Sequence, residues 1–158
     1  MPETTAEDAI ARDLVARFGT PAQVAALAVP DMAAAGRITS RVRALREARG
    51  ERPVGRKIGF SNRGLWERYG VDRPMWNHVW DTTLTEAPEA EASLDVARFP
   101  EPRIEPEIVL RLDRAPEPGM DEAALLGCVG AVAHGFEIVQ SILPGWRFTA
   151  AQCAAALG

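Results

Sequence analysis

The sequence lacks the short motifs of several large enzyme classes, and each absence removes a class of function. None of the 158 residues forms a Walker-type or dinucleotide-type glycine loop, and no GxSxG elbow is present. These motifs cradle phosphate groups or expose a nucleophilic serine. The net charge of -4 is too small to indicate a nucleic-acid partner. Nucleotide-binding, serine-hydrolase and nucleic-acid-binding functions are therefore not indicated.

Signals for export and for membrane insertion are also missing. Residues 1–8 lack the basic start and apolar stretch of a secretory signal, and no apolar run reaches transmembrane length. We therefore expect a cytoplasmic protein without a membrane partner. Cysteine is scarce as well. Cys128 and Cys153 have neither CxxC nor histidine-ligand spacing, which predicts buried free thiols and neither a disulfide nor a zinc site.

The expected helices are indicated by capping residues and by apolar periodicity. Thr4 or Thr5, followed by an acidic residue at capping-box spacing, predicts a helix that ends before Gly19. A second helix is expected from Asp31 to Gly50. Shorter helices are expected at 62–70, 121–132 and 149–157.

Short β-prone runs bounded by glycine or proline predict strands. The expected strands are 53–60, 93–99, 103–112 and 135–141. Pro106 cannot donate a ladder hydrogen bond, so its strand is expected at a sheet edge or bulged there. Residues 71–81 are dense in aromatic and polar groups. They suit a pocket wall, or a packed loop in which Trp66, Trp76 and Trp80 anchor the core.

A strongly basic stretch begins inside the second expected helix and continues beyond its end. Eight cations stand against Glu47 and Glu51, a local excess of 8 − 2 = +6. The cations are Arg37, Arg41, Arg43, Arg46, Arg49, Arg52, Arg56 and Lys57. This pattern fits a solvated helix face or a surface that steers anions.

Lys57 is the only lysine beside seventeen arginines, and Gly55 and Gly59 bracket it. Lysine can change its protonation state near neutral pH when its surroundings shift its pKa, whereas arginine cannot. Lys57 is therefore a candidate catalytic residue, with an ordinary surface cation as the alternative. Asp81 fits either a helix N-cap or a catalytic carboxylate. His78 has no HxH or HExxH context, which favours a hydrogen-bonded structural histidine over a metal ligand.

Three glutamates lie inside apolar, β-prone runs, where carboxylates are unexpected. Glu105 and Glu107 are two residues apart, so on a strand their side chains point to the same face. Glu137 is expected to add a third oxygen from a neighbouring strand. Burying unpaired carboxylates is costly unless a partner or a metal offsets their charge. An all-oxygen set favours Mg²⁺, Mn²⁺ or Ca²⁺ over zinc.

Four blocks, in this order, resemble the fumarylacetoacetate hydrolase superfamily, and within it the 2-keto-4-pentenoate hydratase and 4-oxalocrotonate decarboxylase branch. The blocks are GRKIGF at 55–60, YGVDRP at 69–74, RIEPEI at 103–108, and FEIVQS at 136–141 with Trp146 after it. The resemblance covers most of the chain from about Val54 onward.

The resemblance implies an α+β fold, with N-terminal helices in 1–52 and part of a mixed, rolled β-sheet core in 53–158. It implies Mg²⁺ or Mn²⁺ binding by Glu105, Glu107 and Glu137. It places Lys57 in the active site, and Asp81 near the pocket by a looser correspondence. Family members continue into further strands, so the chain is expected to correspond to a C-terminally truncated hydratase.

The activity implied by the resemblance is metal-dependent hydration of a 2-hydroxy-dienoate or 2-keto-4-pentenoate in the catabolism of aromatic-derived compounds. The expected partners are a small-molecule 2-oxo acid substrate and further copies of the chain in a homo-oligomer. One alternative is decarboxylation of a vinylogous 2-oxo diacid of the 4-oxalocrotonate type. A second is a truncated, non-catalytic subunit.

Overall fold

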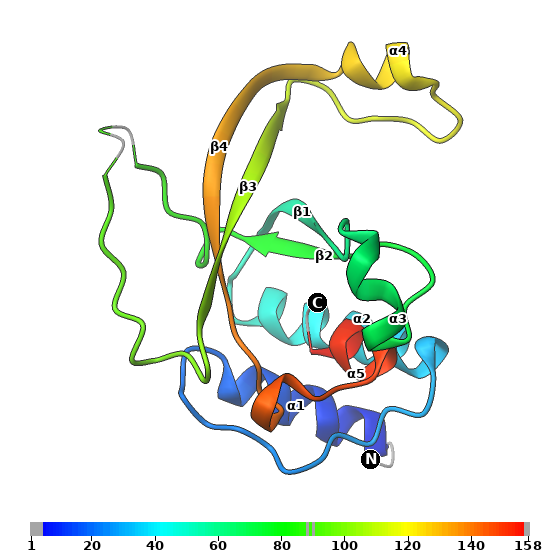
Figure 1. The fold of residues 1–158 in the computed structure, drawn as a ribbon, viewed down its shortest axis with the longest axis vertical. Helices are drawn as coiled ribbons and strands as arrows, with labels where there is room; N and C mark the ends of the chain where they lie inside the picture. Colours follow the sequence, from blue (N-terminus) through cyan, green and yellow to red (C-terminus); the bar gives the residue numbers. More distant parts are fainter. Residues whose placement is uncertain (1–4, 88, 90, 157–158) are drawn as a thin grey trace. The chain divides into compact units, whose positions relative to one another are not determined.

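The computed structural model describes residues 5–87, 89 and 91–156. Two compact units make up the chain (Figure 1). The larger unit combines Met1–Glu101 with Ser141–Gly158, and the hairpin unit is Pro102–Gln140. Helices and antiparallel strands occur together, which confirms the α+β class. These units have other bounds than 1–52 and 53–158, and that division stays a prediction.

The first two helices form where the capping residues predict them. Helix α1 (Ala6–Arg17) begins after Thr5, whose hydroxyl accepts from the Asp8 backbone while the Asp8 side chain accepts from Thr5, a complete capping box. Helix α2 (Met32–Ala48) begins after Asp31, whose carboxylate accepts from the backbone N–H of Ala34. None of the described helices has the length and apolarity needed to cross a bilayer.

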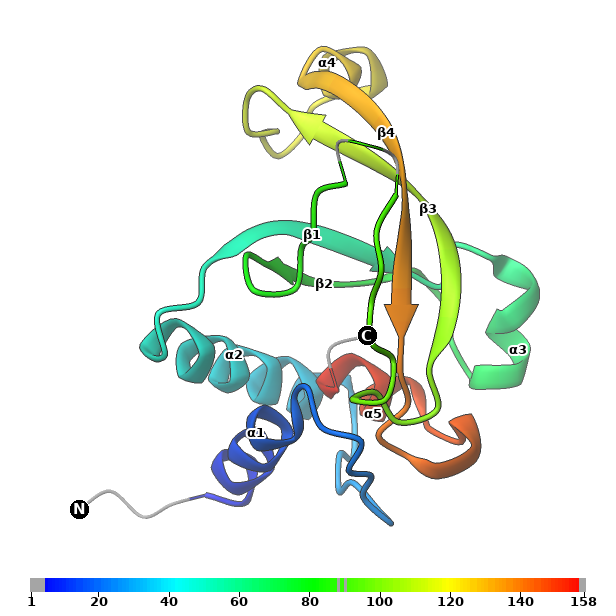
Figure 2. The same cartoon turned by 90° about the vertical axis from the view of Figure 1, so that its left-hand side faces the viewer.

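The core of the larger unit is a three-helix cluster. Helices α1 and α5 (Ala150–Ala155) both pack against α2 (Figures 1 and 2). Ile38 and Val42 on α2 are fully buried, and each contributes about 1.5–3 kcal/mol relative to exposure. Helix α5 starts at a second capping box, between Thr149 and Gln152. The expected end of this helix, at Leu157, lies outside the described residues.

A two-stranded antiparallel sheet completes the larger unit. Strand β1 (Pro53–Gly59) pairs with β2 (Met75–Trp80), and η1 (Arg63–Leu65) and α3 (Trp66–Tyr69) lie between them in the chain. The alternative of a packed loop over residues 71–81 was wrong for 75–80, which form β2. In this strand Met75 and Asn77 are buried while Trp76 is 55% exposed. A polar residue on the buried side concealed the alternation of a strand.

Two further expectations about the larger unit need correction. Of the proposed tryptophan anchors, Trp80 is buried, whereas Trp76 is largely exposed. Residues 93–99 form turns and no strand. The Asp95 carboxylate accepts from the Ala97 backbone, and the Phe99 N–H donates to the Val96 carbonyl. These local bonds compete with strand pairing. The chain then re-enters this unit through η2 (Pro144–Trp146).

The hairpin unit is a long antiparallel ribbon of β3 (Arg103–Leu112) and β4 (Val129–Val139), with α4 (Glu122–Leu126) in the connection (Figure 1). Strand β3 has the predicted bounds. Within the described residues β4 is its sole neighbour, so Pro106 lies on an edge strand as expected, while the irregular pairing is at Arg111 and Leu112. Helix α4 is shorter than predicted, because β4 begins at Val129.

Candidate metal centre

The β3–β4 ribbon has one polar and one apolar face. Side chains alternate along each strand, and residues paired across an antiparallel ladder share a face. Glu105 is paired with Glu137, and Glu107 with Gly135. All three glutamates therefore lie on the same face, which we call the carboxylate face. The geometry predicted for β3 and a neighbouring strand is the geometry observed.

The three carboxylates lie close together. One oxygen of each of Glu105, Glu107 and Glu137 lies within 4.8 Å of the corresponding oxygens of the other two. Glu105 is exposed, while Glu107 and Glu137 are half-buried. Among the described residues, this trio is the one group of three such side chains close enough to share an ion.

The arrangement places like charges next to one another. Like charges directly opposite each other on neighbouring strands destabilise a sheet, by up to roughly 1 kcal/mol for a pair such as Glu105 and Glu137. A third carboxylate on the same face adds to the repulsion. A cation held between the three groups offsets this cost, which is why the cluster is a candidate metal centre.

The donor set matches a hard divalent cation. In an octahedral shell with oxygens about 2.1 Å from Mg²⁺, neighbouring ligand oxygens lie about 3 Å apart and opposite ones about 4.2 Å apart. The three oxygens here fall within 4.8 Å of one another, close to that requirement. Three protein oxygens leave other positions for water or for a chelating ligand. Mg²⁺, Mn²⁺ and Ca²⁺ suit such a site better than Zn²⁺.

Gly135 keeps space on the carboxylate face and was missed in the sequence. It is paired with Glu107, and a Cβ atom placed on it would lie 3.1 Å from Cγ2 of Val109. The missing side chain thus leaves room beside the glutamate. A glycine inside a strand often marks such a close approach, and this signal was available in the run from Val132 to Val139.

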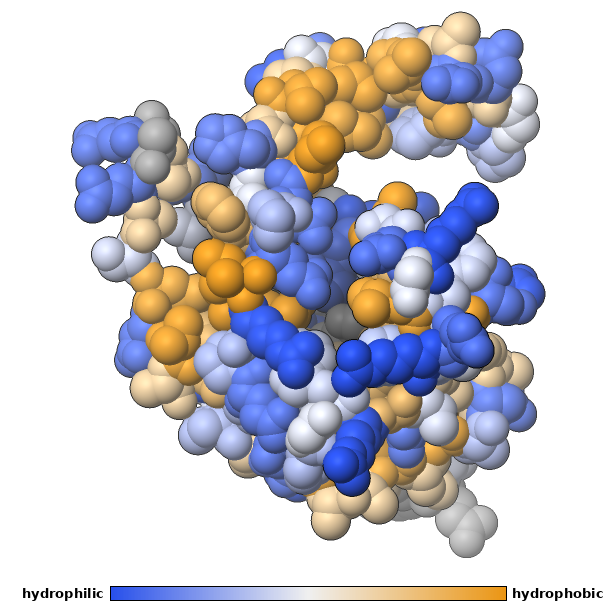
Figure 3. Space-filling view, in the orientation of Figure 1, coloured by the Kyte–Doolittle hydropathy of each residue, from blue (hydrophilic) through white to orange (hydrophobic). Residues whose placement is uncertain are grey.

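The opposite face of the ribbon is apolar and exposed. Ile108 is 77% exposed, and Phe136 is 67% exposed. Further exposed apolar side chains on this face are Ile104, Leu110 and Val132. Figure 3 shows hydrophobic residues gathered over the end of the ribbon next to α4. A large exposed apolar face is typical of an interaction surface.

Lys57 belongs to the larger unit. It lies on β1, paired with Asn77, and is half-buried. Burial raises the pKa of the Cys153 thiol to about 11, and the nearby charge of Lys57 acts in the opposite direction. The ammonium group therefore lies near the thiol on α5. Both cysteines are free, as predicted, and Cys128 is buried.

Asp81 joins the two strands at one end of the β1–β2 pair. Its carboxylate accepts from the Arg52 backbone N–H at 2.9 Å and from Arg52 Nε at 3.2 Å, while the Asp81 N–H donates to the Arg52 carbonyl. The backbone hydrogen bond from Arg52, with the guanidinium, lowers the pKa of Asp81 below its usual value. The residues directly after Asp81 form a turn and no helix begins there, so the N-cap alternative is wrong.

Comparisons with known proteins find sequences that are similar to this chain. No family model matches it. It is 32% identical over 101 residues to a 4-oxalocrotonate decarboxylase from a Pseudomonas species, covering 64% of this chain and 38% of the relative. It is 35% identical over 104 residues to a 2-hydroxyhexa-2,4-dienoate hydratase from Comamonas testosteroni, covering 65% of this chain and 39% of the relative.

A solved structure shows the same fold. The 4-oxalocrotonate decarboxylase from Pseudomonas putida G7, complexed with magnesium and adipate, superposes with a TM-score of 0.81 at 18% identity. The superposition covers 96% of this chain and 58% of that one. The chain is a relative of these enzymes. The resemblance to the hydratase and decarboxylase branch is thus confirmed, although the chain spans only about two fifths of the length of the two sequence relatives.

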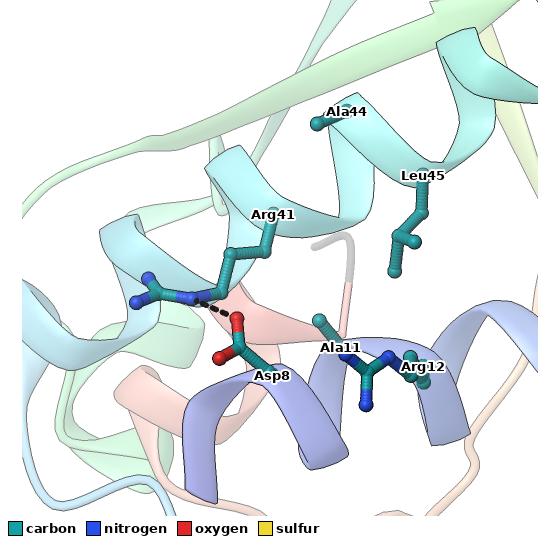
Figure 4. Close-up of a pocket in the computed structure, with 6 residues that line it drawn as sticks. All are labelled: Asp8, Ala11, Arg12, Arg41, Ala44 and Leu45. Atoms are coloured by element: carbon teal, nitrogen blue, oxygen red, sulfur yellow. Dashed lines mark hydrogen bonds and ion pairs between the residues drawn. The ribbon is translucent and has the colours of Figure 1, made fainter. Parts of the chain in front are cut away.

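A cavity also lies between α1 and α2. It measures about 180 Å³ and is lined by Asp8, Ala11, Arg12, Arg41, Ala44 and Leu45 (Figure 4). Arg41 donates from Nε to the Asp8 carboxylate at 2.8 Å across this seam. The charged groups join the two helices, and the cavity is a gap in their packing.

Proposed function

We propose that the chain belongs to a divalent-metal-dependent hydratase, a lyase that acts on 2-hydroxy-dienoate or 2-keto-4-pentenoate substrates from aromatic catabolism. The observation that carries this proposal is the trio of Glu105, Glu107 and Glu137, with oxygens within 4.8 Å. The named relatives support the substrate class, because they include a 2-hydroxyhexa-2,4-dienoate hydratase and a 2-hydroxypent-2,4-dienoate hydratase.

In this proposal Glu105, Glu107 and Glu137 hold Mg²⁺ or Mn²⁺. When bound, such an ion supplies Lewis-acid stabilisation of the enolate charge that develops on a 2-oxo acid. The carboxylate face presents the ligand oxygens from two paired strands. Gly135 leaves the neighbouring space open.

Proton transfer is assigned to Lys57. Hydration of a dienol requires a proton to move to carbon before water adds, and a lysine ammonium can donate that proton from Nζ. Lys57 can also pair with the substrate carboxylate, and we propose that it does both. Asp81 was the second candidate from the sequence. Its hydrogen bonds to Arg52 favour a role in joining the strand ends over contact with substrate.

Decarboxylation is the second candidate function, favoured by two observations. A sequence relative and a solved structure of the same fold are both 4-oxalocrotonate decarboxylases. The two reactions share a metal-stabilised enolate and differ in whether a carboxylate is lost as CO₂. The third possibility is a non-catalytic subunit.

One experiment separates these functions. The purified chain is incubated with Mg²⁺ and 2-hydroxypenta-2,4-dienoate, and loss of the dienol absorbance is followed. A parallel sample receives 4-oxalocrotonate and is monitored for CO₂. Formation of 4-hydroxy-2-oxopentanoate supports the hydratase, and release of CO₂ supports the decarboxylase. A chain that binds Mn²⁺ but turns over neither substrate is a non-catalytic subunit.

We also propose that the chain self-associates. The support is the exposed apolar face of the β3–β4 ribbon, since an isolated two-stranded ribbon is marginally stable until that face is covered. Two such faces can stack like the sheets of a sandwich, about 10 Å apart. Sedimentation velocity over a range of concentrations tests this proposal.

A further inference from the structure

Most of the basic stretch from Arg37 to Lys57 is neutralised inside the larger unit. The ion pairs join Arg37 to Glu7, Arg41 to Glu7 and Asp8, Arg43 to Glu47, Arg46 to Glu51, and Arg52 to Asp81. Arg56 differs from these residues, because it forms no ion pair with any described residue. The stretch as a whole is therefore not a surface that steers anions. The candidate for anion binding is a much smaller site around Arg56.

Arg56 is held in place by an aromatic ring. Its guanidinium carbon lies 4.7 Å from the centre of the Trp76 ring. Such stacking orients an arginine while its N–H groups remain available to a ligand. On the strand pair, Arg56 is directly opposite His78. Nη1 of Arg43, from α2, lies 3.5 Å from Nε2 of His78. Two guanidinium groups thus flank one imidazole.

These side chains surround a cavity of about 240 Å³. It is lined by Arg43, Pro53, Gly55, Arg56 and His78, and none of these residues is acidic. Burial lowers the pKa of His78, and the charges of Arg43 and Arg56 lower it further. Glu47 acts in the opposite direction, but its carboxylate is bonded to Arg43 Nε at 2.8 Å. The charges that act most strongly on the imidazole are therefore those of the two guanidinium groups.

We propose that this cavity, the Arg43–Arg56–His78 pocket, binds the carboxylate or phosphate group of a small anionic ligand. Arginine matches such groups because its planar fork donates two parallel hydrogen bonds to their oxygens. His78 adds a third donor once it is protonated. Every residue of the pocket lies in the larger unit, and none belongs to the glutamate trio. The proposal is therefore independent of the metal centre and of the proposed reaction.

The test uses the titration of His78. A bound anion stabilises the imidazolium, so it raises the pH at which the ring protonates. The chain has two histidines, and His134→Gln removes the other NMR signal. The imidazole Hε1 shift is followed against pH in sodium chloride, then in inorganic phosphate and in oxalate at the same ionic strength. We expect a saturable upward shift of the His78 midpoint with at least one of the two oxyanions.

The two oxyanions distinguish the ligand sources. A larger shift with phosphate assigns the pocket to phosphorylated compounds, and a larger shift with oxalate assigns it to organic acids. A midpoint equal to that in chloride for both oxyanions overturns the proposal.

Matched arginine variants locate the site. Arg56→Gln should weaken oxyanion binding about tenfold or more, because one charged fork is lost. Arg63→Gln is the control, since Arg63 also stacks on a tryptophan of the larger unit, with its guanidinium carbon 5.6 Å from the ring centre of Trp66. It should leave binding unchanged. Equal weakening by both variants contradicts the assignment to this pocket.

Discussion

Arg46 and Glu51 form an ion pair in which the arginine is almost entirely removed from solvent. The Arg46 side chain is 4% exposed, and it donates from both Nε and Nη2 to one Glu51 oxygen. The guanidinium is also enclosed by the rings of Phe18 and Trp80, at 4.4 and 4.3 Å from their centres. This contact ties the end of α1 to α2 and β2.

Arg46→Met should therefore lower the free energy of unfolding by about 3 kcal/mol, because it leaves the Glu51 carboxylate without its main partner. Urea unfolding followed by circular dichroism measures the change. Arg37→Met is the matched control, since Arg37 also pairs with a glutamate but its side chain is 55% exposed. An equally small effect of both substitutions would show that the buried pair contributes no more than a surface one.

Repulsion within the glutamate trio predicts that the stability difference between a glutamine variant and the wild type changes sign when metal is added. Without divalent ions, Glu105→Gln should stabilise the chain by a few tenths of a kcal/mol, because a like-charge pair with Glu137 is removed. With Mg²⁺ or Mn²⁺ present, the wild type should become the more stable protein, since only it binds the ion well. Thermal unfolding with and without metal measures both effects.

Glu117→Gln provides the control for charge alone, because Glu117 is an exposed glutamate in the α4 connection of the same unit. It should leave the response to metal unchanged. Glu107→Ala should also abolish metal-dependent turnover, and unchanged turnover would remove Glu107 from the metal shell.

Lys57 and Asp81 should respond differently to conservative substitution. Lys57→Arg retains the positive charge but prevents proton transfer near neutral pH, so kcat should fall about 10²–10⁴-fold. Asp81→Asn should lower the melting temperature while kcat stays within a few-fold of wild type, because its carboxylate is bonded to Arg52. Steady-state kinetics and melting curves separate the two roles. A large loss of kcat in a stable Asp81→Asn protein would make Asp81 catalytic.

Acid should weaken the larger unit through Asp8. Hydrogen bonds from Thr5, with that from Arg41, lower the pKa of Asp8 to about 2 from a usual 3.8. Because the folded pKa is the lower one, this stabilisation is present above about pH 3.8 and is lost as the pH falls through about 2. Asp8→Asn should flatten the dependence of stability on pH in that window. Unfolding measured from pH 5 to pH 2 in both proteins tests the prediction.

Self-association should depend on the apolar face of the β3–β4 ribbon. Ile108→Ser and Phe136→Ser each remove a side chain that is at least two thirds exposed, and should shift the chain toward monomer. Val109→Ser is the control, because Val109 lies on the carboxylate face of the same strand and is 46% exposed. Sedimentation velocity reports the distribution of species. Equal effects on both faces would contradict an interface restricted to the apolar one.

Local signals predicted much of the fold. The caps at Thr5 and Asp31 act within one turn, so α1 and α2 begin where the sequence indicates. The alternation of β3 is likewise a local property. Residues 93–99 alternate in the same way, yet among the described residues they have no strand beside them. The Ala97 N–H donates to the Asp95 carboxylate, and a turn forms instead. Strand pairing depends on residues far apart in the sequence, and the periodicity of one segment does not specify them.

The same distinction separates the two sites. Glu105 and Glu107 share a face because of their spacing alone, so the metal centre could be predicted once a third glutamate was placed on a neighbouring strand. The Arg43–Arg56–His78 pocket depends on the pairing of β1 with β2 and on the packing of α2 beside them. The basic stretch drew attention to these residues, but it did not show which of its arginines form ion pairs.

The two-faced ribbon also constrains how this gene can vary. Deleting one codon between those for Glu105 and Leu112 would shift part of β3 by one residue. The side chains of that part would then point to the opposite faces of the ribbon, so that polar and apolar residues exchange places. Length changes are far better tolerated in the turn at 113–121, which precedes α4. Natural variants should therefore differ in length at that turn and keep the number of residues in β3 unchanged.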